Sequence, residues 1–163
     1  MKHLVRLGLA GWVTLLTFAL VGGVGAAGPP ATCTAGLVIF TTSPGTVTTT
    51  GVVTHFRDSG VGGQYTAGFL AGYTFSGSQD IQRNNRTQQA ELHGAYVASG
   101  PGGRLTVRYT GHADLLTGAA TGHFVAGPGT GDFTQFHWAG DITAQLVSAA
   151  PPTFLATDSG PCH

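Results

Sequence analysis

The chain has 163 residues, of which 42% are hydrophobic and 9% are charged. Its seven basic and seven acidic residues give a net charge of zero when histidine is neutral. The basic residues do not cluster, so we do not expect a nucleic-acid-binding surface. After the first segment, no apolar run approaches the roughly 20 residues of a membrane-spanning helix.

The first 27 residues are typical of a secretory signal peptide. Lys2 and Arg6 precede an apolar run that extends over 7–21. Small residues at 25–27 predict cleavage near Gly28. The signal predicts a secreted or periplasmic protein. The remaining residues, 28–163, have a normal size for one domain with one hydrophobic core.

Without this segment the chain carries five basic and seven acidic residues, because Lys2 and Arg6 belong to it. The mature protein therefore has a net charge of −2 with histidine neutral. This charge disfavours anionic membrane surfaces as well as nucleic acid, so we expect neither as a partner.

Two cysteines bracket the predicted mature chain, Cys33 near its start and Cys162 near its end. Export through an oxidising compartment predicts a disulfide between them. Their spacing lacks the close Cys-x-x-Cys pattern of zinc sites. The first strand and the last segment should therefore lie side by side.

The rest of the chain predicts one β-strand after another, and no segment has helical periodicity. Glycine- and proline-rich turn sequences separate the strands, and Gly68 and Gly72 indicate bulges or sharp bends in the longest one. Polar pairs such as Asp158-Ser159 are interpreted as local turns. The predicted strands are 35–41, 46–57, 64–82, 88–99, 104–115, 119–126, 133–147 and 153–157.

These strands predict an all-β fold, a single antiparallel closed barrel of about eight strands. Long strands with regular glycines favour closure, because a curved sheet then has no free edges. The pairing of Cys33 with Cys162 favours closure too. A β-sandwich or jelly roll is the alternative.

Three glycine-containing segments carry a resemblance to a known fold: Gly94-Ala95-Tyr96, residues 117–124, and Gly129-Thr130-Gly131-Asp132-Phe133. The pattern resembles the calycin-like barrels of the allene oxide cyclase and dirigent-like superfamily over about residues 65–147. The resemblance implies an eight-stranded antiparallel barrel whose interior holds an apolar ligand, in some members for cofactor-free cyclisation. It also implies a homo-oligomer, since members often form dimers or trimers.

Strand pairing predicts a row of polar side chains across neighbouring strands. A two-residue turn at 117–118 places His112 opposite His123, and the preceding hairpin places Glu91 opposite His112. An odd-length loop before the last long strand adds His137 to the row. Three imidazoles and a carboxylate are a ligand set for zinc or another divalent metal. Four neighbouring strands span about 14 Å, so only a row curved around the barrel interior could share one ion. A solvated histidine row is the alternative.

The two faces of the strand over 104–115 differ in polarity. Leu105, Val107 and Tyr109 alternate with arginine, threonine and histidine residues. Burial of apolar surface places the apolar face in the core and the polar row in solvent. The inverse arrangement would make the apolar face an oligomer surface and the interior a polar reaction chamber.

Two functions from different classes follow from this arrangement. The first is a secreted barrel that binds a small apolar molecule among aromatic side chains, without a cofactor. The alternative for these side chains is that they only fill the core. The second is a cofactor-free cyclase or isomerase in which Glu91, His93 or His112 transfers a proton. A histidine-based metal-binding protein is a third alternative. The aromatic ligand-binding candidates are Tyr65, Phe69, Tyr73, Phe75, Tyr109, Phe124 and Trp138.

Overall fold

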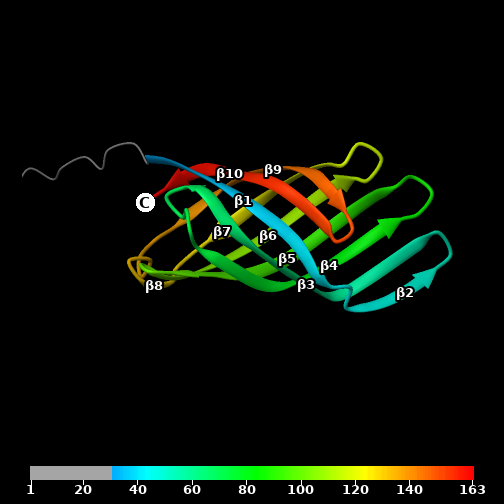
Figure 1. Ribbon diagram of the computed structural model, residues 1–163, viewed down its shortest axis with the longest axis horizontal. Helices are drawn as coiled ribbons and strands as arrows, with labels where there is room; N and C mark the ends of the chain where they lie inside the picture. Colours follow the sequence, from blue (N-terminus) through cyan, green and yellow to red (C-terminus); the bar gives the residue numbers. More distant parts are fainter. Residues whose placement is uncertain (1–30) are drawn as a thin grey trace, which may run out of the picture.

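The computed structural model describes residues 31–163, which fold into a closed antiparallel β-barrel with no helix among them (Figure 1). The predicted signal peptide over 1–27 lies outside the described residues. The strands are β1 (Ala31–Ser43), β2 (Thr46–Thr50), β3 (Val53–Gly68), β4 (Thr74–Asn84), β5 (Gln89–Gly100), β6 (Gly103–Asp114), β7 (Ala119–Ala126), β8 (Thr130–Gly131), β9 (Trp138–Ala149) and β10 (Pro152–Cys162).

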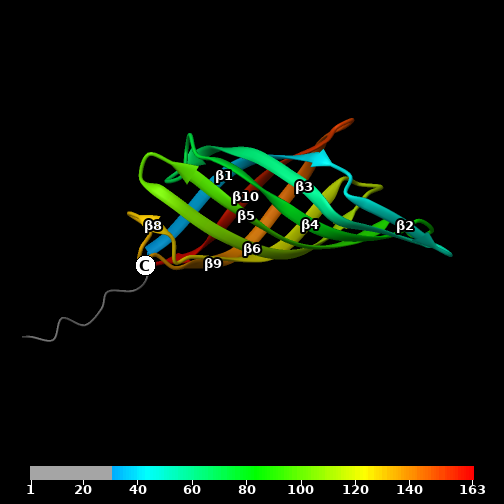
Figure 2. The same cartoon turned by 90° about the horizontal axis from the view of Figure 1, so that it is seen from below.

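Eight of these strands make the wall of the barrel, in the order β1-β10-β9-β7-β6-β5-β4-β3, and the pairing of β1 with β3 closes it. The short strands β2 and β8 are additions that pair with β3 and β6. Figure 2 shows β2 and the start of β3 projecting beyond the wall, at the end opposite the C-terminus. The predicted closed barrel is therefore confirmed, and the sandwich alternative is wrong.

A disulfide joins the first strand to the last. Ala31 pairs with Cys162 and Cys33 with Gly160 in the β1–β10 ladder, which brings the Cα atoms of the two cysteines to 5.8 Å. The bond between Cys33 and Cys162 confirms the predicted pairing. We call this end of the barrel, where the β3–β4 and β5–β6 turns also lie, the disulfide end, and the opposite end the open end.

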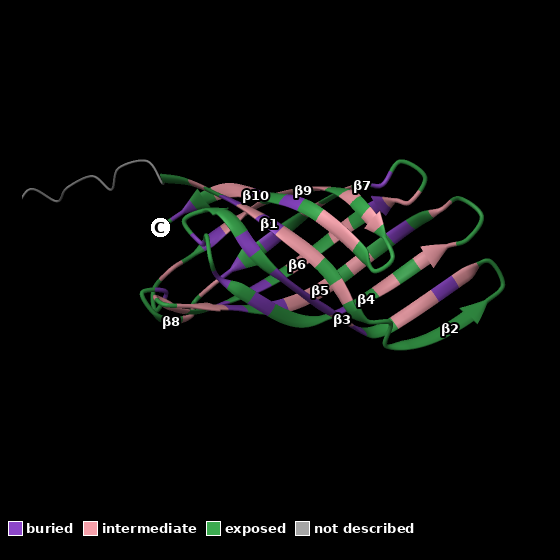
Figure 3. Cartoon of the chain, in the orientation of Figure 1, coloured by how far each residue is buried: buried purple, intermediate pink, exposed green. Residues whose placement is uncertain are grey.

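Buried and exposed residues alternate along much of the barrel wall, whereas β2 is exposed throughout (Figure 3). On β6, Leu105 and Val107 are fully buried, whereas Arg104 and Arg108 are exposed. The apolar face therefore lies inside, as predicted. A cluster of large aromatic side chains fills the disulfide end, with Phe124 packed edge-on against Trp138 at a centroid distance of 4.4 Å.

Inward-facing glycines make room for these aromatic rings. Gly63 on β3 faces the carbonyl oxygen of Val38 and the ring of Phe75, and a Cβ atom there would overlap both. Backbone cannot move aside as a flexible side chain can. We therefore expect Gly63→Val to lower the free energy of unfolding by about 3 kcal/mol, measured by urea denaturation. Gln64→Val, on the exposed face of the same strand, should change it by less than about 0.5 kcal/mol; equal losses would contradict this packing argument.

Several predicted strand boundaries are wrong. The range 46–57 is a hairpin of β2 and β3, and 64–82 is broken by a turn over 69–73. The glycines at this turn, Gly68 and Gly72, have φ values of 80° and 88°, which suit a chain reversal better than a bulge. The last strand is longer than predicted and extends to Cys162.

Candidate functional site

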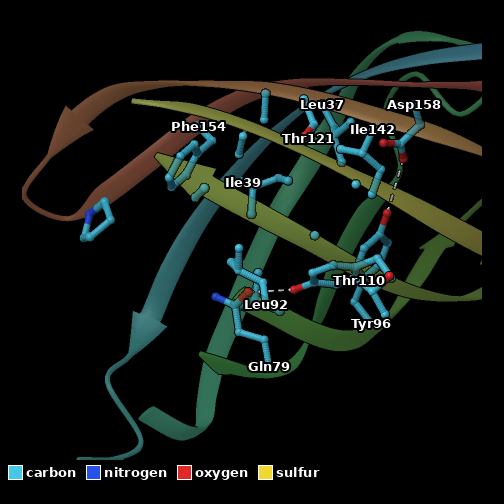
Figure 4. A pocket seen from close by; sticks show the side chains of 18 of the residues that line it. Leu37, Ile39, Gln79, Leu92, Tyr96, Thr110, Thr121, Ile142, Phe154 and Asp158 are labelled. Carbon is cyan, nitrogen blue, oxygen red and sulfur yellow. Dashed lines mark hydrogen bonds between the residues drawn. The ribbon is translucent and has the colours of Figure 1, made fainter. Parts of the chain in front are cut away.

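An apolar cavity occupies the barrel interior between the aromatic cluster and the open end, and Figure 4 shows side chains that line it. Its inner part has a volume of about 90 Å³, and an adjoining outer part of about 420 Å³ lies toward the open end. Aliphatic side chains from several strands, such as Leu37, Ile39 and Ile142, form the inner wall. The residues that line both parts are Thr41, Gln79, Leu92, Ala113, Pro152 and Phe154.

A carboxyl group, Asp158 on β10, lies at the inner end of this cavity. The residue is only 1% exposed. Its Oδ2 atom lies within hydrogen-bond reach of the hydroxyls of Tyr65, at 3.4 Å, and Tyr96, at 3.5 Å. Its Oδ1 atom is buried and has no hydrogen-bond partner. Burial raises the pKa of Asp158 to about 7, although the two tyrosine hydrogen bonds oppose the rise.

The tyrosines around the carboxyl group stay protonated, because burial raises the pKa of Tyr65, Tyr96 and Tyr109 well above the usual value. The hydroxyls of Tyr65 and Tyr96 lie 2.7 Å apart, so one donates to the other and the second is left to donate to Oδ2 of Asp158. Tyr109 donates to Oε1 of Gln79 at 2.8 Å, which leaves the Nε2 amide of Gln79 for a ligand. The inner cavity thus has a few neutral polar groups beside one carboxyl group.

Strand parity explains why Asp158 faces inward. Cys162 must point toward Cys33, and residues two apart share a face, so Gly160 and Asp158 lie on the same side of β10 as Cys162. The interpretation of Asp158-Ser159 as a local turn is wrong, because both residues belong to the strand. The disulfide itself is the sequence signal that could have identified this residue.

One cation lines the outer part of the cavity. Arg83 on β4 donates from Nη2 to Oε1 of Gln88 at 2.7 Å, while its buried Nε atom has no partner. Arg83 and Asp158 are the only charged residues that line either part of the cavity in the described chain. The cavity therefore has a positive group near its mouth and an acidic group at its inner end.

The predicted catalytic residues lie on the outer surface. Glu91 pairs with His112 across β5 and β6, as predicted, and His93 lies on the same exposed face of β5. None of the three lines the interior cavity. Glu91 and His112 border a separate polar hollow of about 240 Å³ outside the barrel.

The predicted histidine row is not formed. His112 pairs with Thr121, and His123 pairs with Thr110, two positions away from the predicted register. The cause is the turn before β7, where the Asp114 carboxylate accepts hydrogen bonds from two backbone amides and stabilises a four-residue loop instead of a two-residue one.

The remaining members of the row lie apart as well. His123 forms an exposed pair with Asp141, with 2.6 Å between Nδ1 and Oδ1. His137 precedes β9 at the disulfide end, where its ring stacks on His163 with centroids 5.5 Å apart. Within residues 31–163, no group of three or more histidine, cysteine or acidic side chains has an arrangement that could hold a metal ion.

Of the seven aromatic residues predicted to bind a ligand, Tyr109 alone lines the cavity. The others pack in or against the aromatic cluster below it, and Tyr65 contributes only through its hydrogen bond to Asp158. Phe69, 40% exposed, lies edge-on to Trp138. The alternative that these side chains only fill the core thus describes six of the seven: Tyr65, Phe69, Tyr73, Phe75, Phe124 and Trp138.

Comparisons with protein-family models, with curated proteins and with solved structures found no match to this chain. Residues 31–163 contain no helix of the length and hydrophobicity needed to span a membrane. Evidence for function therefore comes from the cavity and the groups that line it.

Proposed function

We propose that this protein binds a small, largely apolar molecule inside its barrel, and that it does so outside the cell or in the periplasm. The single observation that carries the proposal is the cavity, which is largely apolar and has a buried carboxyl group, one oxygen of which lacks a hydrogen-bond partner, at its inner end. Ligand sites commonly combine an apolar wall with a few polar groups that fix orientation. The predicted signal peptide and the Cys33–Cys162 disulfide support the location.

A substitution that fills the cavity tests this function. Leu92 lines both parts of the cavity, so Leu92→Trp should weaken binding of the neutral fluorescent probe N-phenyl-1-naphthylamine by at least about tenfold. Val97→Trp is the matched control, because Val97 lies on the same strand but is 39% exposed on its outer face. The control should bind within about twofold of the wild type. Equal loss in both variants, or in neither, would contradict an interior site.

Native mass spectrometry of protein purified from its own host is the complementary measurement. We expect a co-purifying small molecule bound to the wild type and absent from Leu92→Trp.

The carboxyl group at the inner end of the cavity also favours a second function, the cofactor-free isomerase or cyclase that the resemblance implies. A carboxyl group with a pKa of about 7 in an apolar site is suited to taking a proton from one carbon of a substrate and returning it to another. Asp158 would take the role predicted for Glu91, His93 or His112. If so, the wild type should exchange carbon-bound hydrogen of the co-purified molecule with D₂O, and Asp158→Asn should not; absence of exchange in the wild type would contradict catalysis.

A further inference from the structure

Building on the proposed function, we infer that the ligand enters with its polar end first and that this end is a protonated amine which pairs with Asp158. The proposal concerns the chemical class of the ligand: an apolar body with one ammonium group and no acidic group.

The unpaired oxygen of Asp158 is the first observation. The pair of hydroxyls of Tyr65 and Tyr96 supplies a donor to Oδ2, whereas Oδ1 is buried with no hydrogen-bond donor, in a residue that lines the cavity. A buried polar atom without a partner costs free energy, more so when it is charged. A ligand that donates a hydrogen bond to Oδ1 removes that cost.

The absence of a counter-charge at the inner end of the cavity is the second observation. The titratable side chains that contact the carboxyl group are Tyr65 from β3 and Tyr96 from β5, and Tyr109 from β6 packs behind Tyr96; all three are neutral. The neighbouring strands β1 and β9 contribute aliphatic side chains such as Leu37 and Ile142. An ammonium group would therefore supply the one positive charge that this end of the cavity lacks. The rings of Tyr96 and Tyr109 also line the space and attract cations through their faces.

The charge at the mouth sets the orientation. Arg83 lines the outer part of the cavity and would repel an ammonium group placed there, whereas Asp158 attracts one at the inner end. A carboxylate ligand would be repelled by Asp158 and attracted by Arg83. It would therefore enter with its apolar tail first and leave its carboxylate near Arg83. The inner volume of about 90 Å³ fits an amine head and a few methylene groups, and the outer part takes the rest of the apolar body.

Three probes of equal chain length distinguish these cases: hexylamine, 1-hexanol and hexanoate, titrated into the mature protein at pH 8 and followed by isothermal calorimetry and NMR chemical shifts. We expect hexylamine to bind at least about tenfold more tightly than either of the others. Asp158→Asn should weaken hexylamine binding by about 10- to 100-fold and change 1-hexanol binding by less than about threefold. Asp141→Asn is the matched control, because Asp141 is an exposed carboxylate on the neighbouring strand β9. It should leave all three affinities unchanged.

The dependence on pH gives an independent readout. An alkyl amine stays protonated below pH 9, so the pH dependence should follow Asp158, whose pKa is about 7. The affinity for hexylamine should fall by about 100-fold from pH 8 to pH 5, while that for 1-hexanol should not fall. In Asp158→Asn the affinity for hexylamine should not depend on pH over this range.

The outcomes separate this inference from the proposed function. Binding of 1-hexanol as tight as that of hexylamine would overturn the amine assignment and leave an interior apolar site. Tighter binding of hexanoate that is lost in Arg83→Gln would overturn it in favour of an anionic ligand held at the mouth. If none of the three probes binds and N-phenyl-1-naphthylamine does not bind either, both the assignment and the proposed function are wrong.

Discussion

Reduction of the Cys33–Cys162 disulfide is expected to lower the free energy of unfolding by about 5 kcal/mol. The bond closes a loop with a sequence separation of 129, and in the chain-entropy model a cross-link of that length removes much of the freedom of the unfolded chain. For a domain of this size, such a loss lowers the melting temperature by about 15 °C. Thermal unfolding of the mature protein, followed by circular dichroism with and without reductant, measures it.

The double variant Cys33→Ser/Cys162→Ser is the control for this prediction. It should unfold at the temperature of the reduced wild type and should be insensitive to reductant. The bond joins β1 to β10, the pair that brings the first and last strands of the barrel together, so the loss should be seen in global unfolding and not only in fraying of the termini. A loss below about 1 kcal/mol would show that the β1–β10 ladder is stable without the cross-link.

Much of the fold could be predicted from local pattern, because strand alternation is set by burial alone. The sequence of β6 has an apolar and a polar face, and only one arrangement buries the former. The register of β5 with β6 followed from the turn at Pro101-Gly102, which has glycines on both sides and joins Gly100 to Gly103. The pairing of Glu91 with His112 was therefore predicted correctly.

The next hairpin shows where such reasoning fails. The pair Thr117-Gly118 is a good two-residue turn in isolation, yet the Asp114 side chain bonds to the amides of Leu116 and Thr117 and stabilises a longer loop. Two turn types compete within about 1 kcal/mol, and the side-chain cap decides between them. The longer loop shifts the register of β7 against β6 by two residues and separates His112 from His123.

The site was missed for a related reason. Parity predicts which side chains point inward, but their depth along the barrel depends on the stagger between strands, which the sequence does not specify locally. Tyr65 and Tyr109 are both inward aromatic residues, yet only Tyr109 lies at the depth of the cavity. Asp158 was missed because a polar pair near a chain end is more often a turn than a strand.

The same aspartate leads to the second large expected effect, a loss of stability as the pH rises. The pKa of Asp158 is about 7 in the folded protein, above its ordinary value of 3.8, because burial disfavours the carboxylate. The folded state therefore holds the proton more tightly than the unfolded state. The contribution of Asp158 to stability is highest below about pH 4, falls as the pH rises, and levels off above about pH 7. The full difference corresponds to about 4 kcal/mol.

Urea denaturation of the ligand-free mature protein at pH 5 and pH 8 measures most of this effect. We expect the free energy of unfolding to fall by about 3 kcal/mol between these values in the wild type. Asp158→Asn has nearly the same shape without the charge, so its stability should vary much less with pH and should exceed that of the wild type at pH 8. In Asp141→Asn, the exposed carboxylate control, the pH dependence should stay within about 1 kcal/mol of the wild type, because the pair that Asp141 forms with His123 is exposed.

A wild type that is as stable at pH 8 as at pH 5 would contradict the burial of an unpaired carboxyl group. With hexylamine present, the inferred pairing predicts that the loss at pH 8 is partly reversed, because a ligand that binds only the folded state stabilises it and this one binds the ionised form of Asp158. The same amount of 1-hexanol should give less stabilisation at pH 8. Ionisation of Asp158 lowers the stability of the empty barrel, and a cationic ligand that pairs with the carboxylate offsets that loss. The stability of the empty barrel is thus linked to the charge of the ligand that it binds.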